Sequence, residues 1–271
     1  MVRSLWSAAT GMIAQQTNVD TIANNLANVN TTGYKTEVAE FKSLLYQTMQ
    51  TRTTSANGEK KPIGAQVGLG VRNSAITSIF KEGNLLASES QTAYAIVGEG
   101  FFSVRGQDGK AYYTRNGNFN LSTGTNGLTL CNSDGLPVLD ATGKPITFAK
   151  NIISNKIVMT ADGEFCYPDA KNQLQKMGIK IGISQFMNPA GLEKRDSSLY
   201  AVTEASGLAL NEATNANVRK SKLRQGYLEG SNVQVADEMV NLIVAQRAYE
   251  MNSKAIQASD EMMGQANQLK R

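Results

Sequence analysis

Hydrophobic residues recur every seven positions at both ends of the chain. Near the N-terminus this set comprises Leu5, Met12, Val19 and Leu26. Near the C-terminus it comprises Val235, Leu242, Tyr249, Ile256 and Met263. A seven-residue repeat is typical of helices that lie along one another. The pattern therefore predicts long N- and C-terminal helices paired as a coiled coil; the alternative is that each helix is an ordinary amphipathic helix packed on its own core.

Turn and capping residues give the expected limits of both helices. The sequence Asn-Thr-Thr-Gly at residues 30–33 predicts that the first helix ends after about 27 residues. Ser231 followed by Gln234 has the spacing of a capping box and predicts a second helix that runs to about Gln268. At 1.5 Å per residue the two helices would be roughly 40 Å and 55 Å long. Neither length suits a compact domain of this size.

The positions that alternate with the seven-spaced residues are partly polar. On the C-terminal helix they are Met239, Gln246, Ser253 and Asp260. A second stripe consists of Ile22, Val29, Ile243 and Met262. A half-polar contact makes an isolated helix pair weak, and a second apolar stripe offers a face to neighbours, so we expect helices that are stabilised by assembly. Trp6 is expected to be an anchor of an interface rather than a platform for a ligand.

Short apolar runs separated by turn dipeptides fill the middle of the chain. The runs lie at residues 71–79, 93–104, 111–119, 128–131, 156–159 and 180–186. The dipeptides Asp108-Gly109, Asn116-Gly117, Asn126-Gly127, Asp134-Gly135 and Asp162-Gly163 each predict a tight hairpin. Residues 46–66 lack apolar periodicity and predict an extended connector. The predicted fold is therefore mixed: a discontinuous coiled-coil inner domain (1–45 and 231–271), the connector, and an inserted all-β outer domain (67–230).

The residue types present exclude much of catalytic chemistry. The chain contains no histidine, which removes Ser-His-Asp and Cys-His catalysis and His-ligated zinc. Cys131 and Cys166 are too few for a cysteine metal site; we expect two small half-buried thiols, with one disulfide as the alternative. The glycine pairs at 68/70 and 98/100 lack the third glycine and the following helix of a dinucleotide site. No catalytic, cofactor or metal residues and no small-molecule substrate are therefore expected.

Charge and hydropathy restrict the expected partners further. The formal net charge is +4, from 27 basic and 23 acidic residues. No basic cluster is interleaved with aromatic residues, so nucleic acid is not an expected partner. Apolar runs such as 93–97 are far shorter than the ~20 residues of a membrane span. Polar residues interrupt the N-terminal apolar stretch, and we expect an intact N-terminus, with a cleaved signal peptide as the alternative.

The ends of the chain resemble a known family. Residues 4–35, SLWSAATGMIAQQTNVDTIANNLANVNTTGYK, are similar to the N-terminal signature of the bacterial flagellar rod and hook family. Residues 231–263, SNVQVADEMVNLIVAQRAYEMNSKAIQASDEMM, resemble its C-terminal signature, and AIVGEGFFSVR with YYTRNGNF resembles the start of its β domain. The SLWSAATGM opening, the length and the segment at 46–62 resemble the distal rod type more than the proximal rod or hook types, which stay as alternatives.

The resemblance implies a structural subunit and not an enzyme. Such a subunit would polymerise helically into the distal rod, transmit torque to the hook and enclose the export channel. The implied partners are further copies of the chain, proximal rod and hook proteins, ring bushing proteins, the rod cap and the flagellar export apparatus. The implied location is the basal body, reached across the periplasm. Phe41 and Leu45 are the implied export element, the alternative being a local helix face. A globular enzyme or ligand-binding β protein is the contrasting class.

Overall fold

The computed structural model describes residues 2–50, 65–124, 127–149, 152–153, 156–169, 173–196, 198–215 and 218–269. These residues form two compact units. Unit 1 contains Met1–Ala27, Glu37–Ser78 and Gln234–Arg271. Unit 2 contains Asn28–Thr36 and Ile79–Val233. Each unit is therefore assembled from segments that are far apart in the sequence.

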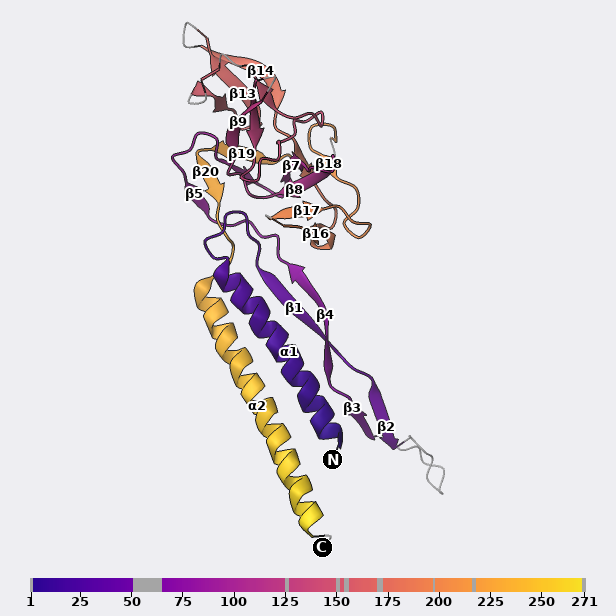
Figure 1. The fold of residues 1–271 in the computed structure, drawn as a ribbon. Helices are drawn as coiled ribbons and strands as arrows, with labels where there is room; N and C mark the ends of the chain where they lie inside the picture. Colours follow the sequence, from indigo (N-terminus) through magenta and orange to yellow (C-terminus); the bar gives the residue numbers. More distant parts are fainter. Residues whose placement is uncertain are drawn as a thin grey trace. The chain divides into compact units, whose positions relative to one another are not determined.

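Two long helices dominate unit 1. Helix α1 spans Val2–Ala27 and helix α2 spans Val235–Gln268. The two helices lie side by side and run antiparallel (Figure 1). At 1.5 Å per residue they are roughly 39 Å and 51 Å long. The predicted terminal helices are confirmed. In the described part of the chain, neither helix is long and apolar enough to cross a membrane.

A long two-stranded ribbon completes unit 1. Strand β1 (Glu37–Ser43) pairs with β4 (Val71–Ser78), and β2 (Tyr46–Gln50) pairs with β3 (Ala65–Gly68), both antiparallel. Helix α1 packs against β1 and β4. The Val71 backbone N–H donates to Thr10 Oγ1 at 3.3 Å, which fixes the ribbon to the helix. Strand β4, assigned to the outer domain by the sequence analysis, is therefore grouped with the helices.

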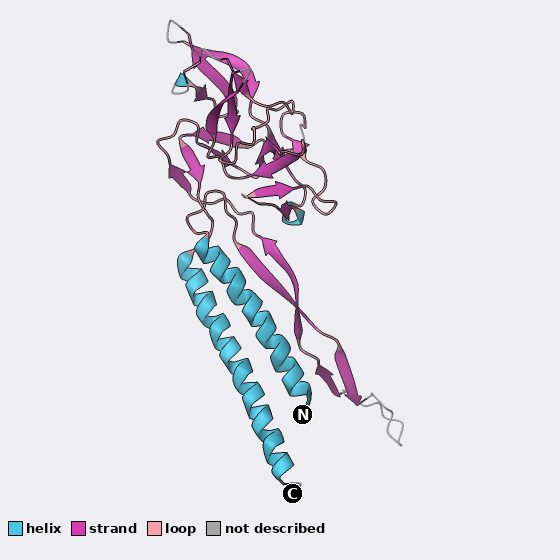
Figure 2. Cartoon of the chain, viewed as in Figure 1, coloured by secondary structure: helices cyan, strands magenta, loops and turns pink. Residues whose placement is uncertain are grey.

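Unit 2 is built from antiparallel strands, which Figure 2 draws in magenta. Its largest sheet has six strands, in the order β16 (Glu193–Lys194), β17 (Leu199–Ala201), β8 (Ala111–Thr114), β7 (Phe101–Arg105), β15 (Ile183–Gln185) and β18 (Leu210–Asn211). One three-stranded sheet contains β9 (Asn120–Gly124), β10 (Gly127–Cys131) and β11 (Thr147–Phe148). Another contains β12 (Val158–Met159), β13 (Glu164–Pro168) and β14 (Leu174–Lys180). The predicted β-rich centre is confirmed.

Two strand pairs and one short helix complete unit 2. Strand β6 (Tyr94–Val97) pairs with β19 (Lys222–Gln225), and β5 (Leu85–Ala87) pairs with β20 (Tyr227–Glu229). A short 3₁₀ turn is formed by Pro189–Gly191. Both pairs join the start of the central region to its end, so the two ends of the insertion are hydrogen-bonded to each other.

The core of unit 2 is rich in aromatic rings. The main cluster surrounds Tyr94, Phe102, Phe119, Phe148 and Phe165, all of which are nearly inaccessible to solvent. Most of these rings meet edge to face, the arrangement that the ring quadrupole favours. Cys131 and Cys166, expected to be half-buried, are buried free thiols. The unit thus holds its fold by apolar packing and not by a disulfide between them.

The turn predictions succeed at most positions and fail at one. Gly109, Gly135 and Gly163 have φ values of 79°, 78° and 80°, as expected for tight turns between strands. Gly127 also has positive φ, although Asn126 lies outside the described residues. Gly117 does not have positive φ, and the predicted hairpin there is wrong. Its α-carbon instead faces the Tyr94 carbonyl oxygen so closely that a side chain would not fit.

The predicted capping box of the second helix is also wrong. Helix α2 begins at Val235, its N-cap residue is Gln234, and no side chain caps it. The Ser231 hydroxyl accepts a hydrogen bond from the Val233 N–H at 3.2 Å, which forms a local turn before the helix. Asp237 and Glu238 lie in the first turn, where the helix dipole favours negative charge. The helix start is therefore stabilised by carboxylates and not by a capping side chain.

Candidate assembly site

The contact between the two helices, which we call the helix seam, is marked by three pairs of small or polar residues. The pairs are Ser4 with Ser259, Gly11 with Asn252, and Asn25 with Glu238. They recur at steps of seven or fourteen residues, forward along α1 and backward along α2. A fixed step of seven residues on both helices means that they keep one register along their shared length.

Small residues let the helix backbones approach closely. Ala8, Ala14 and Ala245 are buried, with exposed fractions of 7%, 4% and 1%. A Cβ atom added to Gly11 would lie 2.9 Å from Asn252 Nδ2. The Asn25 amide donates to Glu238 Oε2 at 3.3 Å, so the seam ends in a buried hydrogen bond. A buried polar pair favours one alignment because any shift leaves its groups unsatisfied.

The polar positions of the seam on α2 lie one residue before those that the repeat predicted. The structure places Glu238, Ser259 and Ala245 in buried positions and Asn252 opposite Gly11. The predicted Met239 is 52% exposed, and Gln246 and Asp260 are also exposed. The prediction is corrected here because small and hydrogen-bonding side chains, not the larger Met and Gln, fit between closely packed backbones.

The nine predicted interface residues flank the seam. Leu5, Met12, Val19, Leu26, Leu242, Ile256 and Met263 are half-buried, whereas Val235 and Tyr249 are exposed. They are therefore only partly covered within unit 1. Their contact with another subunit stays a prediction.

Several apolar side chains of both helices are exposed to solvent. On α2, Val240, Val244, Met251 and Met262 are 60%, 63%, 65% and 55% exposed. Their spacing of four, seven and eleven residues places them on one helix face. On α1, Trp6 and Ile13 are 64% and 66% exposed. We call these six residues the outer apolar set.

The predicted second stripe is only partly available to neighbours. Ile243 and Met262 are exposed at 58% and 55%. Ile22, in contrast, is 5% exposed and belongs to the interior of unit 1, which corrects its assignment to an outer face. The error arose because heptad spacing alone does not tell which of two neighbouring stripes faces the partner helix.

The candidate export residues lie on the ribbon. Phe41 belongs to β1 and is 37% exposed, and Leu45 follows that strand and is 81% exposed. The alternative of a local helix face is therefore wrong, because these residues are extended. Both side chains are accessible in the described structure.

One asparagine in each unit ties together the segments at which the chain passes to the other unit. In unit 1, the Asn25 side chain accepts the Glu37 N–H at 2.9 Å and donates to the Glu37 carbonyl at 2.8 Å. In unit 2, Asn232 Oδ1 accepts the Thr36 N–H at 2.7 Å, and its amide donates to the Ile79 carbonyl at 2.9 Å. Each asparagine replaces backbone partners that these irregular segments would otherwise lack.

Unit 2 also contains a buried ion cluster of Lys35, Arg115 and Glu229. Glu229 Oε1 accepts from Lys35 Nζ at 2.5 Å, and Glu229 Oε2 accepts from Arg115 Nη1 at 3.2 Å. The side chains of Lys35 and Glu229 are fully inaccessible, and that of Arg115 is 2% exposed. The cluster joins Lys35, which precedes unit 2's first strand, to Glu229, the last residue of its last strand β20.

Backbone groups complete the ion cluster. Lys35 Nζ donates to the Lys81 carbonyl at 2.7 Å, and Arg115 Nη2 donates to the Gly98 carbonyl at 2.8 Å. The Gly83 N–H donates to Glu229 Oε1 at 3.1 Å. Burial lowers the pKa of Lys35 below its ordinary value, while the attraction and hydrogen bond of Glu229 oppose that shift. One carboxylate thus compensates two buried cations.

Sequence reasoning missed the ion cluster and both asparagines. Lys35 is the last residue of the N-terminal signature, but nothing in the local pattern pairs it with a residue 194 positions away. Asn25 gave a usable signal, because asparagine is a poor helix former and yet lies in the last turn of α1. In the described residues no group of three or more Cys, Asp and Glu side chains is placed to hold a metal ion.

Comparisons with known proteins agree with this architecture. Residues 5–35 match the family model described as flagella basal body rod protein, and residues 224–269 match the flagellar basal body rod FlgEFG protein C-terminal model. Residues 95–174 match the flagellar hook protein FlgE/F/G D1 domain. The two outer matches cover the two helices, and the central match covers part of unit 2.

Relatives match the chain over its whole length. It is 45% identical to the flagellar basal-body rod protein FlgG of Borreliella burgdorferi, with 100% of both chains covered. It is 42% identical to that of Agrobacterium fabrum, over 96% of this chain and 97% of the relative, and 37% identical to that of Bacillus subtilis, over 100% of both. The chain therefore belongs to the flagellar basal-body rod protein family. It is a structural rod subunit of the flagellum and not an enzyme.

Proposed function

We propose that the chain is the distal rod subunit, which polymerises helically into the flagellar drive shaft, encloses the export channel and carries torque to the hook. The full-length relatives named as rod protein FlgG support a rod subunit and do not favour a hook protein. The observation that carries helical assembly is the outer apolar set on α1 and α2. These large side chains are left exposed beside a seam that small residues already fill.

Covering these side chains stabilises the polymer. Burying an aliphatic or methionine side chain contributes about 1.5–3 kcal/mol relative to full exposure. Four such residues on α2 alone, covered in every subunit, give each copy a strong preference for neighbours. In this proposal α1 and α2 pair as a coiled coil, residues 1–27 and 234–271 form an inner tube around the channel, and residues 79–233 form the outer layer.

Repeated lateral contacts explain how a marginal helix pair transmits torque. The seam contains Gly11, Asn25 and Ser259, whose side chains are absent or polar. Such a pair resists bending and twisting only when surrounding copies hold it. The connector at 46–66 would fill gaps between neighbours; its residues 51–64 lie outside the described part of the chain.

The same proposal assigns the partners. The rod would contact further copies of itself, the proximal rod and hook proteins at its ends, and the ring bushing proteins around it. The rod cap and the flagellar export apparatus would act during assembly. The chain would cross to the periplasmic side without signal cleavage, and the exposed Phe41 and Leu45 would form the export element.

Charge placed on the outer apolar set tests the assembly. Val244→Asp with Met251→Asp puts two carboxylates on the outer face of α2, and burying an unpaired charge in a subunit contact is strongly unfavourable. We expect exported protein without rods, measured by secreted chain and by electron microscopy of basal bodies. The control, Gln246→Asp with Gln257→Asp, adds the same charge at exposed polar positions and should build rods. Rods of normal length from the first variant would contradict the proposal.

The export element has its own test. Phe41→Ala with Leu45→Ala should lower the amount of secreted chain while the protein accumulates inside the cell. Val38→Ala with Met49→Ala removes two similarly exposed apolar residues of the same ribbon and serves as the control. Equal secretion by the two variants would remove the assignment without affecting rod assembly.

A further inference from the structure

A basic cleft lies at the start of strand β7. It has a volume of about 610 Å³ and is lined by residues that include Lys81, Arg219, Lys220 and Lys222. Glu82 and Glu99 also line it, so its lining carries more positive than negative groups. Gly98 and Glu99, which lie three and two residues before β7 begins at Phe101, form part of its wall. The cleft belongs entirely to unit 2.

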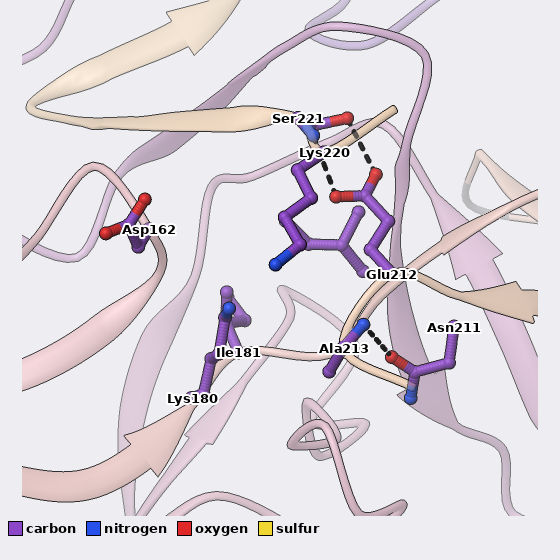
Figure 3. Close-up of a pocket in the computed structure, with 9 residues that line it drawn as sticks. Asp162, Lys180, Ile181, Asn211, Glu212, Ala213, Lys220 and Ser221 are labelled. Carbon is purple, nitrogen blue, oxygen red and sulfur yellow. Dashed lines mark hydrogen bonds between the residues drawn. The ribbon is translucent and has the colours of Figure 1, made fainter. Parts of the chain in front are cut away.

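The backbone that carries the basic side chains is fixed in place. Figure 3 shows Ser221 and Glu212 facing each other, and the Glu212 carboxylate accepts from the Ser221 N–H at 2.8 Å and its hydroxyl at 2.7 Å. Gln185 Nε2 donates to the Arg219 carbonyl at 2.7 Å. Lys222 pairs with Val97 in the β19–β6 ladder. The basic side chains are exposed, but the segment that bears them is held at both ends.

An acidic hollow lies at the other end of the same strand. It has a volume of about 400 Å³, and Asp108, Asp134 and Asp196 line it around the ring of Tyr112. The Tyr112 hydroxyl donates to Asp108 Oδ2 at 2.9 Å, which lowers the pKa of that carboxyl. The neighbouring Lys110 and Arg195 lie outside its lining. Gly106 and Asp108, which follow the last residue of β7, place the hollow one strand length from the cleft.

We propose that unit 2 of one subunit contacts unit 2 of the next head to tail, with the acidic hollow of one copy seated against the basic cleft of another. The proposal rests on the proposed helical assembly and adds the surfaces that would meet. Helical polymers need heterologous contacts, in which two different patches of the same chain meet. Patches of opposite charge separated by a five-residue strand, roughly 17 Å, meet that need. The occupant of the cleft is therefore a second copy of this chain.

Reciprocal charge reversal tests the contact in the host bacterium with its own gene deleted. The first variant, Lys220→Glu with Lys222→Glu, makes the cleft acidic; the second, Asp134→Lys with Asp196→Lys, makes the hollow basic. Each variant alone then presents like charges at the contact, and we expect the chain recovered in purified rods to fall about tenfold or more. Lys144→Glu with Lys156→Glu changes exposed residues outside both surfaces and should give rods in normal amount.

Expression of the two variants together gives the decisive result. The acidic cleft of the first variant then faces the basic hollow of the second, and the unchanged surfaces also complement each other. We expect mixed rods in near-normal amount, which also demonstrates that both variants fold. Failure of the mixture to restore rods, or normal rods from either variant alone, would overturn the contact. If the contact is overturned but the wild-type chain is still found in rods, the proposed function stands. If the wild-type chain is absent from rods, the proposed function itself fails.

Discussion

Replacing Glu229 by glutamine isolates the contribution of the buried ion cluster. The change keeps the size of the side chain but removes the only negative charge among the three members of the cluster. Lys35 and Arg115 then remain in a site that solvent does not reach. Their nearest remaining partners are then the backbone carbonyls of Lys81 and Gly98 and, for Arg115, the ring of Phe101.

The expected loss follows from burial. Removing one partner of a buried ion pair costs about 3–5 kcal/mol, because an uncompensated charge is left inside. Glutamine can still accept hydrogen bonds from Lys35 and Gly83, so the lower end of that range is expected. For a domain above about 150 residues, 1 kcal/mol shifts the melting temperature by about 2–4 °C, and the variant should melt about 6–12 °C lower.

Thermal unfolding followed by near-ultraviolet circular dichroism measures the effect, because the aromatic core lies in the same unit. Glu164→Gln is the matched control: it breaks a pair with Lys176, whose side chain is 70% exposed, and should leave the midpoint unchanged. Adding Lys35→Met to Glu229→Gln removes one of the two buried cations that have lost their counter-charge. The double variant should therefore regain part of the lost melting temperature. Equal melting of the two glutamine variants, or no recovery in the double variant, would refute the assigned role of buried charge.

The same variant has an expected pH dependence. The folded-state pKa of Lys35 lies below its ordinary value of 10.5, and Glu229 raises it. Without Glu229 that pKa falls further, so the folded state binds fewer protons than the unfolded state over a wider pH window. Stability in that window rises with pH. The deficit of Glu229→Gln should therefore shrink as pH approaches 10.5, and a growing deficit would contradict the argument.

Three further substitutions test other parts of the structure. Gly33→Ala should destabilise unit 2 by about 1–3 kcal/mol, because Gly33 has a φ of 72° and an added Cβ would meet the Asn116 backbone. Urea unfolding measures this loss of stability, and an unchanged unfolding midpoint would contradict the prediction. Gly11→Leu should separate the helices, because even a Cβ atom at this position reaches Asn252. Faster proteolysis of α1 would report the separation, and Gly11→Ala is the control that should be tolerated. Leu26→Asp puts a charge into a half-buried apolar position at a cost of several kcal/mol in the assembled state, and should be exported without building rods; rods of wild-type length would contradict it.

The helices and most strands were predictable because their signals are local. A seven-residue repeat identifies the helices, and Gly109 or Gly163 marks a turn, within a few residues of sequence. The seam register was not predictable to the residue. Choosing Glu238 over Met239 depends on the facing residue of the other helix, Asn25, whose amide donates to the Glu238 carboxylate.

The ion cluster shows a second limit. Lys35, Arg115 and Glu229 come from three distant segments, and each alone reads as an exposed surface charge. Only the strand pairings of β5 with β20 and β6 with β19 bring the ends of unit 2 together and bury them. Gly117 was misread for the same reason: its role is contact with the Tyr94 carbonyl, which a turn dipeptide does not encode.

Electron microscopy of basal bodies from a strain that lacks this chain tests the central claim most directly. If the chain is the distal rod subunit, the mutant should contain a short proximal rod with no distal rod and no hook, and the wild-type gene should restore both. Basal bodies that carry a full-length rod and a hook in the absence of the chain would contradict the account.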